Sequence, residues 1–187
     1  PIATASELPN PRMNDNGLSI EGEPPPANNQ QPFVTYVSVS DDYFRLLGIP
    51  LRNGRTFGPE DRFGAPTSVV ISAAMERKFW PKGGAIGARI RLGPNAQSPW
   101  KVIVGVVGDV RNDPVSPEPQ SITYVSRRQE PTGNLSFLVR TPVNPLALAK
   151  NIQAAAASFA PDLATHNVTT MNELLSRPQA DRVVLCA

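Results

Sequence analysis

The sequence predicts an α+β fold with two lobes, one of them inserted into the other. Two observations predict it: both ends of the chain show the order strand, helix, strand, and the segment between them has more β character. A chain of 187 residues is long enough for two such lobes to bury a core. We expect residues 33–64 and 132–177 to form the outer lobe and residues 65–131 to form the inserted, β-rich lobe.

Residues 1–32 precede the first lobe and are predicted to form an irregular N-terminal arm. The segment contains the run Pro24-Pro25-Pro26 and several asparagines, and it has few apolar residues that could anchor it. We therefore expect it to lie on the surface without regular structure.

The first strand-helix-strand unit follows this arm. Phe33–Val39 is rich in β-branched and aromatic residues, which predicts a strand. Ser40 is expected to cap a helix that begins with two acids and ends at Gly48 in the left-handed conformation. Residues 49–52 are expected to form a short strand. The buried face of the helix is predicted to comprise Tyr43, Phe44 and Leu47.

The middle segment predicts a second strand and helix, followed by a hairpin. Residues 68–71 are apolar, and Ser72 can cap a helix that carries Met75 and Phe79 on one face. Residues 89–92 alternate polar and apolar side chains, and residues 100–107 supply the return strand. Four prolines from residue 114 to residue 131 interrupt regular structure, so residues 122–125 are expected to form at most an edge strand.

The C-terminal part predicts a strand at residues 135–140, a long helix and a short helix. The long helix begins near Pro145, and the short one has the capping-box spacing of Thr170 and Glu173 and ends near Arg177. Residues 178–187 form an apolar tail that we expect to lead toward a membrane helix. Across the whole chain, burial is expected at Phe44, Leu47, Ile71, Phe79, Val104, Val106, Ile152 and Phe159.

Composition excludes several classes of function. The 18 basic and 16 acidic residues are spread along the chain, so a net charge of +2 provides no basic patch for nucleic acid. Cys186 is the only cysteine, which rules out an internal disulfide and a cysteine metal cluster. No apolar run approaches the roughly 20 residues that a membrane helix needs, and no signal peptide is recognisable.

Candidate catalytic and cofactor residues have simpler structural explanations. The lone His166 has no partner at ligand spacing, and the acid pairs at 41–42 and 60–61 fit helix starts and turns. The glycines of Gly105-Val106-Val107-Gly108 lack the third glycine and the helix of a dinucleotide site, so they indicate a bulge or close packing. No serine lies in a nucleophile elbow. We expect no catalytic residue, no metal and no cofactor, and we expect Arg55 to pair with Asp61.

An ordered set of motifs resembles a known family. The stretch VSVSDDYFRLLGIPLRNGRTF at residues 37–57 is followed in order by Asp61, VVIS, RKFWP, IGARIRLG, VIVGVVGDVR, LVRT, NPLAL and MNELL. In this order the motifs resemble the periplasmic core domain of macrolide-exporter-type, FtsX-like ABC transporter permeases, especially the acidobacterial permease group. The positions that carry the resemblance, which we expect to be structural, are Tyr43, Phe44, Gly48, Gly54, Arg55, Phe57, Asp61, Phe79, Trp80, Gly87, Gly105, Gly108 and Asp109.

The resemblance implies a porter-like outer lobe of two β-α-β units and a sabre-like inserted lobe, outside the cytoplasmic membrane. It implies a non-catalytic domain that couples ATP-driven motion to export or to partner proteins. The partners implied are a cytoplasmic ABC ATPase, reached through the membrane part, a second permease subunit and a periplasmic adaptor or substrate protein. Two other functions remain open: a small-molecule or peptide binding module, which a deep polar pocket would favour, and a hydrolase, which clustered acids with perturbed pKa values would favour.

Overall fold

The computed structural model describes residues 2–6, 15–24, 31–93, 97–110, 118–132, 136–145, 147–148, 150–151, 154, 158 and 169–176. Pro1–Val139 form one compact unit and Arg140–Ala187 form a second. The predicted boundaries at residues 64 and 131 therefore do not coincide with a break between compact units. His166, Cys186, Ile152, Phe159 and the tail at 178–187 lie outside the described residues.

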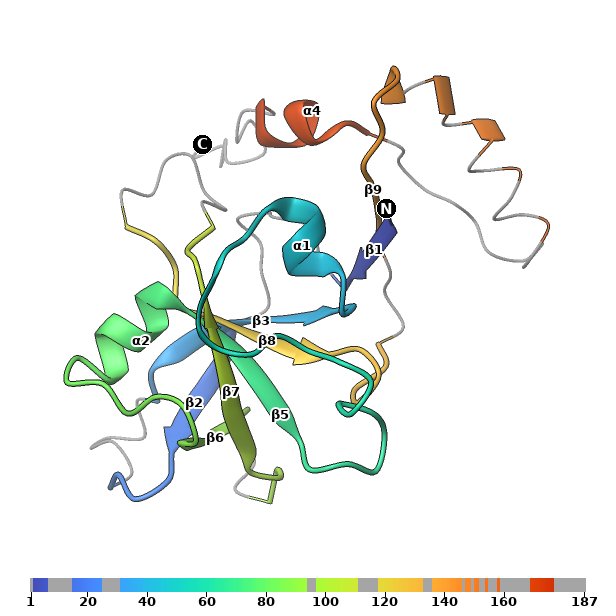
Figure 1. Ribbon diagram of the computed structural model, residues 1–187. Helices are drawn as coiled ribbons and strands as arrows, with labels where there is room; N and C mark the ends of the chain where they lie inside the picture. Colours follow the sequence, from blue (N-terminus) through green and yellow to red (C-terminus); the bar gives the residue numbers. More distant parts are fainter. Residues whose placement is uncertain are drawn as a thin grey trace, which may run out of the picture. The chain divides into compact units, whose positions relative to one another are not determined.

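One mixed sheet contains the described strands of the first unit (Figure 1). Its strands in chain order are β1 (Ile2–Ala5), β2 (Asp15–Ile20), β3 (Phe33–Val39), β4 (Leu51–Gly54), β5 (Ser68–Ser72), β6 (Arg89–Leu92), β7 (Lys101–Val107), β8 (Ile122–Ser126) and β9 (Ser136–Val139). The described helices with defined bounds are α1 (Tyr43–Leu47), α2 (Ala73–Phe79) and α4 (Met171–Ser176).

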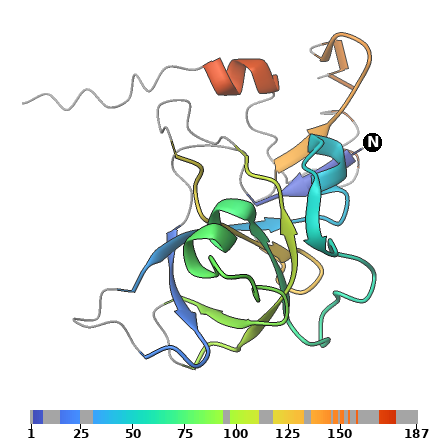
Figure 2. The same cartoon turned by 60° about the vertical axis from the view of Figure 1, so that its left-hand side comes forward.

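The sheet closes into a barrel. Hydrogen bonds join the strands in the order β2-β6-β7-β5-β8-β3, and β2 also pairs with β3. The closure depends on β2, which pairs with β3 through residues 15–17 and with β6 through residues 18–20. Figure 2 shows α2 in front of the strands that form this barrel. From the ring, β1 continues the sheet beyond β3, and β9 pairs with β1.

The barrel encloses the main hydrophobic core. Side chains from all six of its strands pack with Met75 of α2, and along β5 and β6 the core residues alternate. Phe79 and Trp80 at the end of α2 are half-buried against this core. The fully buried members include Leu18, Val69, Ile71, Ile90, Ile103 and Val106.

Several local predictions are confirmed. The strand at 33–39, the hairpin of β6 with β7, and the strand at 68–72 form as expected. Ser72 caps α2, because its Oγ accepts a hydrogen bond from Met75 N at 3.2 Å. Gly48 ends α1 with φ of 69°. Thr170 and Glu173 form the capping box, with bonds of 3.0 and 3.2 Å between each backbone N–H and the other side chain.

The predicted irregular arm at residues 1–32 is wrong for residues 2–5 and 15–20, which form β1 and β2. Alternate small or apolar residues of these strands face the core, with Ala5 and Leu18 at most 1% exposed. Backbone pairing with distant strands supplies the stability that the local sequence lacks. A segment poor in apolar residues can therefore still be an integral part of a sheet.

The predicted edge strand at residues 122–125 is also wrong. β8 lies between β5 and β3, and all of its residues are buried. The prolines that suggested an edge lie outside the strand, so they remove none of its ladder hydrogen bonds. β9, which forms within the strand predicted at residues 135–140, lies in the same sheet as β3, and β1 separates the two strands.

Smaller differences come from register. Ser40 does not cap α1: its Oγ accepts a hydrogen bond from Thr4 N at 2.9 Å, and the N-cap residue is Asp42. Leu46 rather than Leu47 is buried, and Ile103 rather than Val104. The strand predicted at 49–52 lies at 51–54. Strands of both predicted lobes belong to one sheet. The division into a porter-like and a sabre-like lobe stays a prediction from the resemblance.

Candidate functional site

An aromatic cluster joins three of the family-motif residues outside the barrel. The ring of Tyr124 lies 5.0 Å from that of Phe44 in an edge-to-face arrangement and 6.0 Å from that of Tyr43. Phe57 packs on Phe44 at 6.2 Å. Burial raises the pKa of Tyr43 to about 12, so its hydroxyl stays protonated at neutral pH. The cluster fixes α1 against β8. Tyr124 was not among the predicted residues, and its only sequence signal was its place in the strand-like run at residues 122–125.

Arg55 and Asp61 form the predicted ion pair at the edge of this cluster. Both terminal guanidinium nitrogens of Arg55 donate to the carboxylate of Asp61, at 2.6 and 3.0 Å. Ser68 Oγ and Gly58 N also donate to this carboxylate, at 2.5 and 2.9 Å. Burial favours the protonated acid, but these hydrogen bonds and the charge of Arg55 together hold the pKa of Asp61 below its ordinary value. The buried, charged carboxylate of Asp61 therefore links residues 55, 58 and 68 by hydrogen bonds.

Three motif glycines permit close approach of the backbone. Gly54 pairs with Gly105 where β4 lies antiparallel to β7, and the register of β7 with β5 shifts next to Gly105. A Cβ atom on Gly105 would overlap the carbonyl oxygen of Arg55. A Cβ on Gly108 would lie 3.0 Å from the ring of Pro50. These contacts support the interpretation of Gly105 and Gly108 as positions of a bulge or close packing, which stays a prediction.

The remaining motif residues stabilise α2 and the turn after it. Asp109 accepts hydrogen bonds from Ala74 N at 2.6 Å and from the guanidinium of Arg77 at 2.8 Å. Gly87 has φ of 86°, and its N–H donates to the carbonyl of Ile103 at 2.8 Å. The motif residues therefore bond to the backbone or pack in the core, and they do not converge on a cavity. We maintain their structural role as a prediction.

A second ion pair lies near the same end of the barrel as the Arg55–Asp61 pair, because Lys101 begins β7 beside Ser68, which begins the parallel strand β5. Lys101, at 6% exposure, contacts Glu130 through its Nζ. The other carboxylate oxygen of Glu130 accepts a hydrogen bond from the hydroxyl of Tyr36 at 2.8 Å. The sequence indicated none of this cluster, because its three members come from β7, β3 and the turn after β8.

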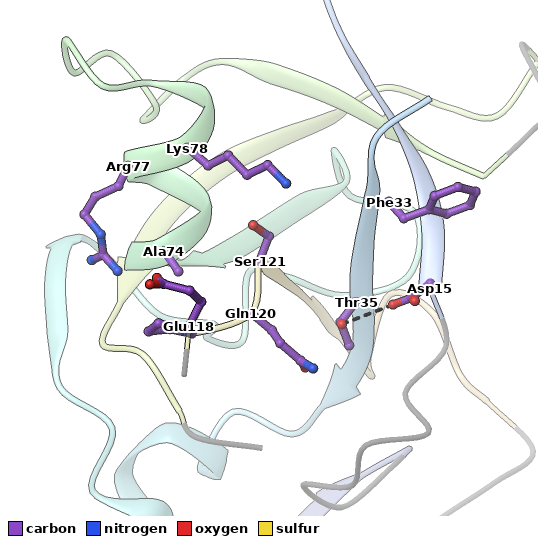
Figure 3. A pocket seen from close by; sticks show the side chains of 10 residues that line it. Asp15, Phe33, Thr35, Ala74, Arg77, Lys78, Glu118, Gln120 and Ser121 are labelled. Carbon is purple, nitrogen blue, oxygen red and sulfur yellow. Dashed lines mark hydrogen bonds between the residues drawn. The ribbon is translucent and has the colours of Figure 1, made fainter. Parts of the chain in front are cut away.

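A depression lies elsewhere, between α2 and the start of β3 (Figure 3). Its volume is about 570 Å³ and it opens to solvent. Lys78 reaches over it from α2, while Asp15 and the exposed ring of Phe33 lie on the opposite wall. Its lining residues are Asp15, Phe33, Thr35, Ala74, Arg77, Lys78, Glu118, Pro119, Gln120 and Ser121.

Metal-binding groups of side chains and membrane-spanning helices are both absent from the described part of the chain. It contains no group of three or more histidine, cysteine, aspartate or glutamate side chains that could hold a metal ion. Within it, no helix has both the length and the apolar character of a membrane span.

The sequence model of one protein family matches the chain. The MacB-like periplasmic core domain matches residues 14–155, a range that includes the aromatic cluster, the Arg55–Asp61 pair and the strands β2 to β9. The chain belongs to this family. The MacB-like motifs at residues 37–110 include α1, β4 and α2, the elements that pack on the barrel. A comparison with curated proteins gives no match.

Solved structures share the fold. The periplasmic region of MacB from Actinobacillus actinomycetemcomitans superposes with a TM-score of 0.58 at 13% identity, covering 84% of this chain and 66% of that structure. The extracellular domain of the noncanonic ABC-type transporter YknZ from Gram-positive bacteria superposes with a TM-score of 0.53 at 18% identity, covering 86% of this chain and 74% of that structure. The chain thus spans slightly less than two thirds of the MacB periplasmic region.

Proposed function

We propose that this MacB-like domain is an extracytoplasmic, non-catalytic part of an ABC transporter permease that couples ATP-driven motion of the membrane part to export or to partner proteins. Family membership supports the permease context. The buried hydrogen bonds of Asp61 support the mechanical role, because a domain that transmits motion must move as a rigid body. In this proposal the domain is periplasmic.

The observation that carries the coupling role is the way distant segments are bonded together. The carboxylate of Asp61 bonds to Arg55, Gly58 and Ser68, and its backbone carbonyl accepts a hydrogen bond from Ser126 at 2.9 Å. Gln129 then bonds to Ser68 and to the carbonyl of Pro66. The loop at 58–66 and the turn at 126–130 are therefore held to the same two strands, β5 and β8. Force applied to either segment would reach the barrel without local unfolding.

The partners in this proposal are a cytoplasmic ABC ATPase, reached through the membrane part, a second permease subunit and a periplasmic adaptor or substrate protein. The domain would supply no chemistry of its own. Its motif residues serve packing and backbone bonding, and the sequence contains no phosphate loop.

The test uses the full permease with cysteine at position 63. Phe63 is 81% exposed on a turn closed by the bond from Ala65 N to Arg62 O, so it can be replaced without disturbing the core. A bifunctional thiol reagent that joins the domains of two neighbouring subunits should impair transport, should leave ATP binding intact, and should have no effect on the cysteine-free protein. Undiminished transport after complete cross-linking would show that the domain does not move with the transport cycle, and would leave it as a passive docking surface.

A binding module is the second candidate, and one observation favours it. The depression beside α2 brings charged, polar and aromatic side chains together over one open volume.

A further inference from the structure

The depression beside α2 has the size of a small-molecule site. Its volume of about 570 Å³ falls within the range of roughly 300 to 1,000 Å³ that such sites occupy. It is walled by α2 on one side, by β2 and β3 on another, and by residues 118–121 on the third (Figure 3). Arg77 and Lys78 belong to the RKFWP motif of the family, and the other lining residues lie outside the motifs.

The wall formed by α2 provides an available cation. The ammonium group of Lys78 lies 5.2 Å from the ring centroid of Phe79, and it forms no ion pair with a described residue. Its neighbour Arg77 differs, because its guanidinium is bonded to Asp109 at 2.8 Å. In Figure 3 the side chain of Lys78 extends over the depression, whereas Arg77 points away from it. Lys78 is therefore the group on this wall that can receive an anion.

The opposite wall provides acceptors. The hydroxyl of Thr35 donates to one carboxylate oxygen of Asp15 at 3.3 Å, which leaves the exposed second oxygen able to accept another bond. The amide oxygen of Gln120 is buried and has no hydrogen-bond partner among the described residues. A buried acceptor without a donor is unfavourable, so this oxygen favours a ligand that brings an N–H group. Phe33, 66% exposed on the same wall, offers an apolar face.

We propose that this depression binds a small zwitterion of about the size of a dipeptide. Its carboxylate pairs with Lys78, its ammonium group pairs with Asp15, an N–H group bonds to the amide oxygen of Gln120, and an apolar side chain packs on Phe33. A simple anion would face the charge of Asp15, and a simple cation would face that of Lys78. A molecule with both charges satisfies both walls. This binding goes beyond the proposed coupling function and does not depend on it.

The test is a titration of the ¹⁵N-labelled chain with the zwitterionic dipeptide alanyl-leucine, followed through the backbone amide signals. We expect saturable shifts of the signals of Lys78 and Gln120, with a Kd of about 1 mM or below. N-acetyl-alanyl-leucinamide, which has the same side chains and neither charge, should bind at least about tenfold more weakly, since it loses two charge-assisted contacts. This comparison requires no variant of the protein.

Two variants identify the contacts. Lys78→Met keeps the apolar stem and removes the ammonium group, and Asp15→Asn keeps the shape and removes the charge. Each should raise the Kd about tenfold. Lys82→Met is the matched control, because Lys82 is an exposed lysine just beyond α2 that does not line the depression, and it should leave the Kd unchanged. The proposal is overturned if no saturable shift occurs, if the capped dipeptide binds as well as the free one, or if Lys78→Met and Lys82→Met behave alike.

Discussion

Asp61 and Arg55 form a two-pronged ion pair in which the carboxylate is buried and the guanidinium is half-exposed. The side chains are 3% and 44% exposed, and the two bonds measure 2.6 and 3.0 Å. The guanidinium also contacts the exposed carboxylate of Glu60, while the Asp61 carboxylate accepts hydrogen bonds from Ser68 and Gly58. The pair therefore stabilises the fold mainly through what Asp61 accepts from its neighbours.

Replacement of Asp61 by alanine should lower the free energy of unfolding by about 3 kcal/mol, because it leaves the buried hydroxyl of Ser68 and the N–H of Gly58 without this acceptor. Chemical denaturation measures this change. Glu60→Ala is the control: Glu60 contacts the same guanidinium at 3.0 Å but is 57% exposed, so its loss should cost less than about 1 kcal/mol. Equal losses of unfolding free energy in the two variants would show that the burial of Asp61 contributes nothing to its stabilising effect.

The pKa shift of Asp61 predicts a pH dependence of stability. Its pKa in the folded protein lies below the ordinary value of 3.8, so the unfolded state binds the proton more readily. The stabilisation is fully present above about pH 4 to 5 and is lost as the pH falls through the folded pKa. We expect the difference in unfolding midpoint between wild type and Asp61→Asn to narrow below pH 4. A difference that stays constant down to pH 2 would contradict the assignment.

Truncation of Phe44 to alanine should cost about 3 to 5 kcal/mol, because the ring is 2% exposed and packs between Tyr43, Phe57 and Tyr124. Phe79→Ala should cost less than Phe44→Ala, since Phe79 is only half-buried. Phe63→Ala, at an 81% exposed position, should change the free energy of unfolding by less than about 0.5 kcal/mol. Denaturation midpoints in this order would support the described core, and a wild-type midpoint for Phe44→Ala would refute it.

Gly105→Ala should destabilise the chain by about 2 kcal/mol or more, because the added methyl group meets the carbonyl oxygen of Arg55 and neither backbone can move freely. Gly108→Ala should cost less, since its methyl group meets the ring of Pro50 at 3.0 Å and the ring can shift slightly. Thermal unfolding of the two variants provides the comparison. A milder effect at Gly105 than at Gly108 would contradict the close approach of Gly105 to the backbone of Arg55.

The isolated chain should neither bind nor hydrolyse ATP, because the sequence lacks a phosphate loop with its lysine and hydroxyl residues. Calorimetric titration with ATP and magnesium should give no binding heat at micromolar concentrations. Saturable, magnesium-dependent binding would contradict the non-catalytic role that we propose.

The sequence by itself determined the features that depend on near neighbours. The glycine at position 48 predicted the left-handed end of α1, Ser72 predicted the cap of α2, and the spacing of Thr170 and Glu173 predicted the capping box. The pairing of Arg55 with Asp61, six residues apart, was also predicted. In each case the bond joins groups close in the chain, so few conformations compete with it.

The tertiary structure alone decided the closure of the barrel and the contents of the depression. β1 and β2 have little apolar sequence of their own, and they are strands because β3, β6 and β9 satisfy their backbone groups. The depression is lined by Asp15, Lys78 and Gln120, although more than 100 residues separate Asp15 from Gln120 along the chain. Such contacts depend on the summed free energy of many distant pairings, and no local pattern of side chains encodes that sum.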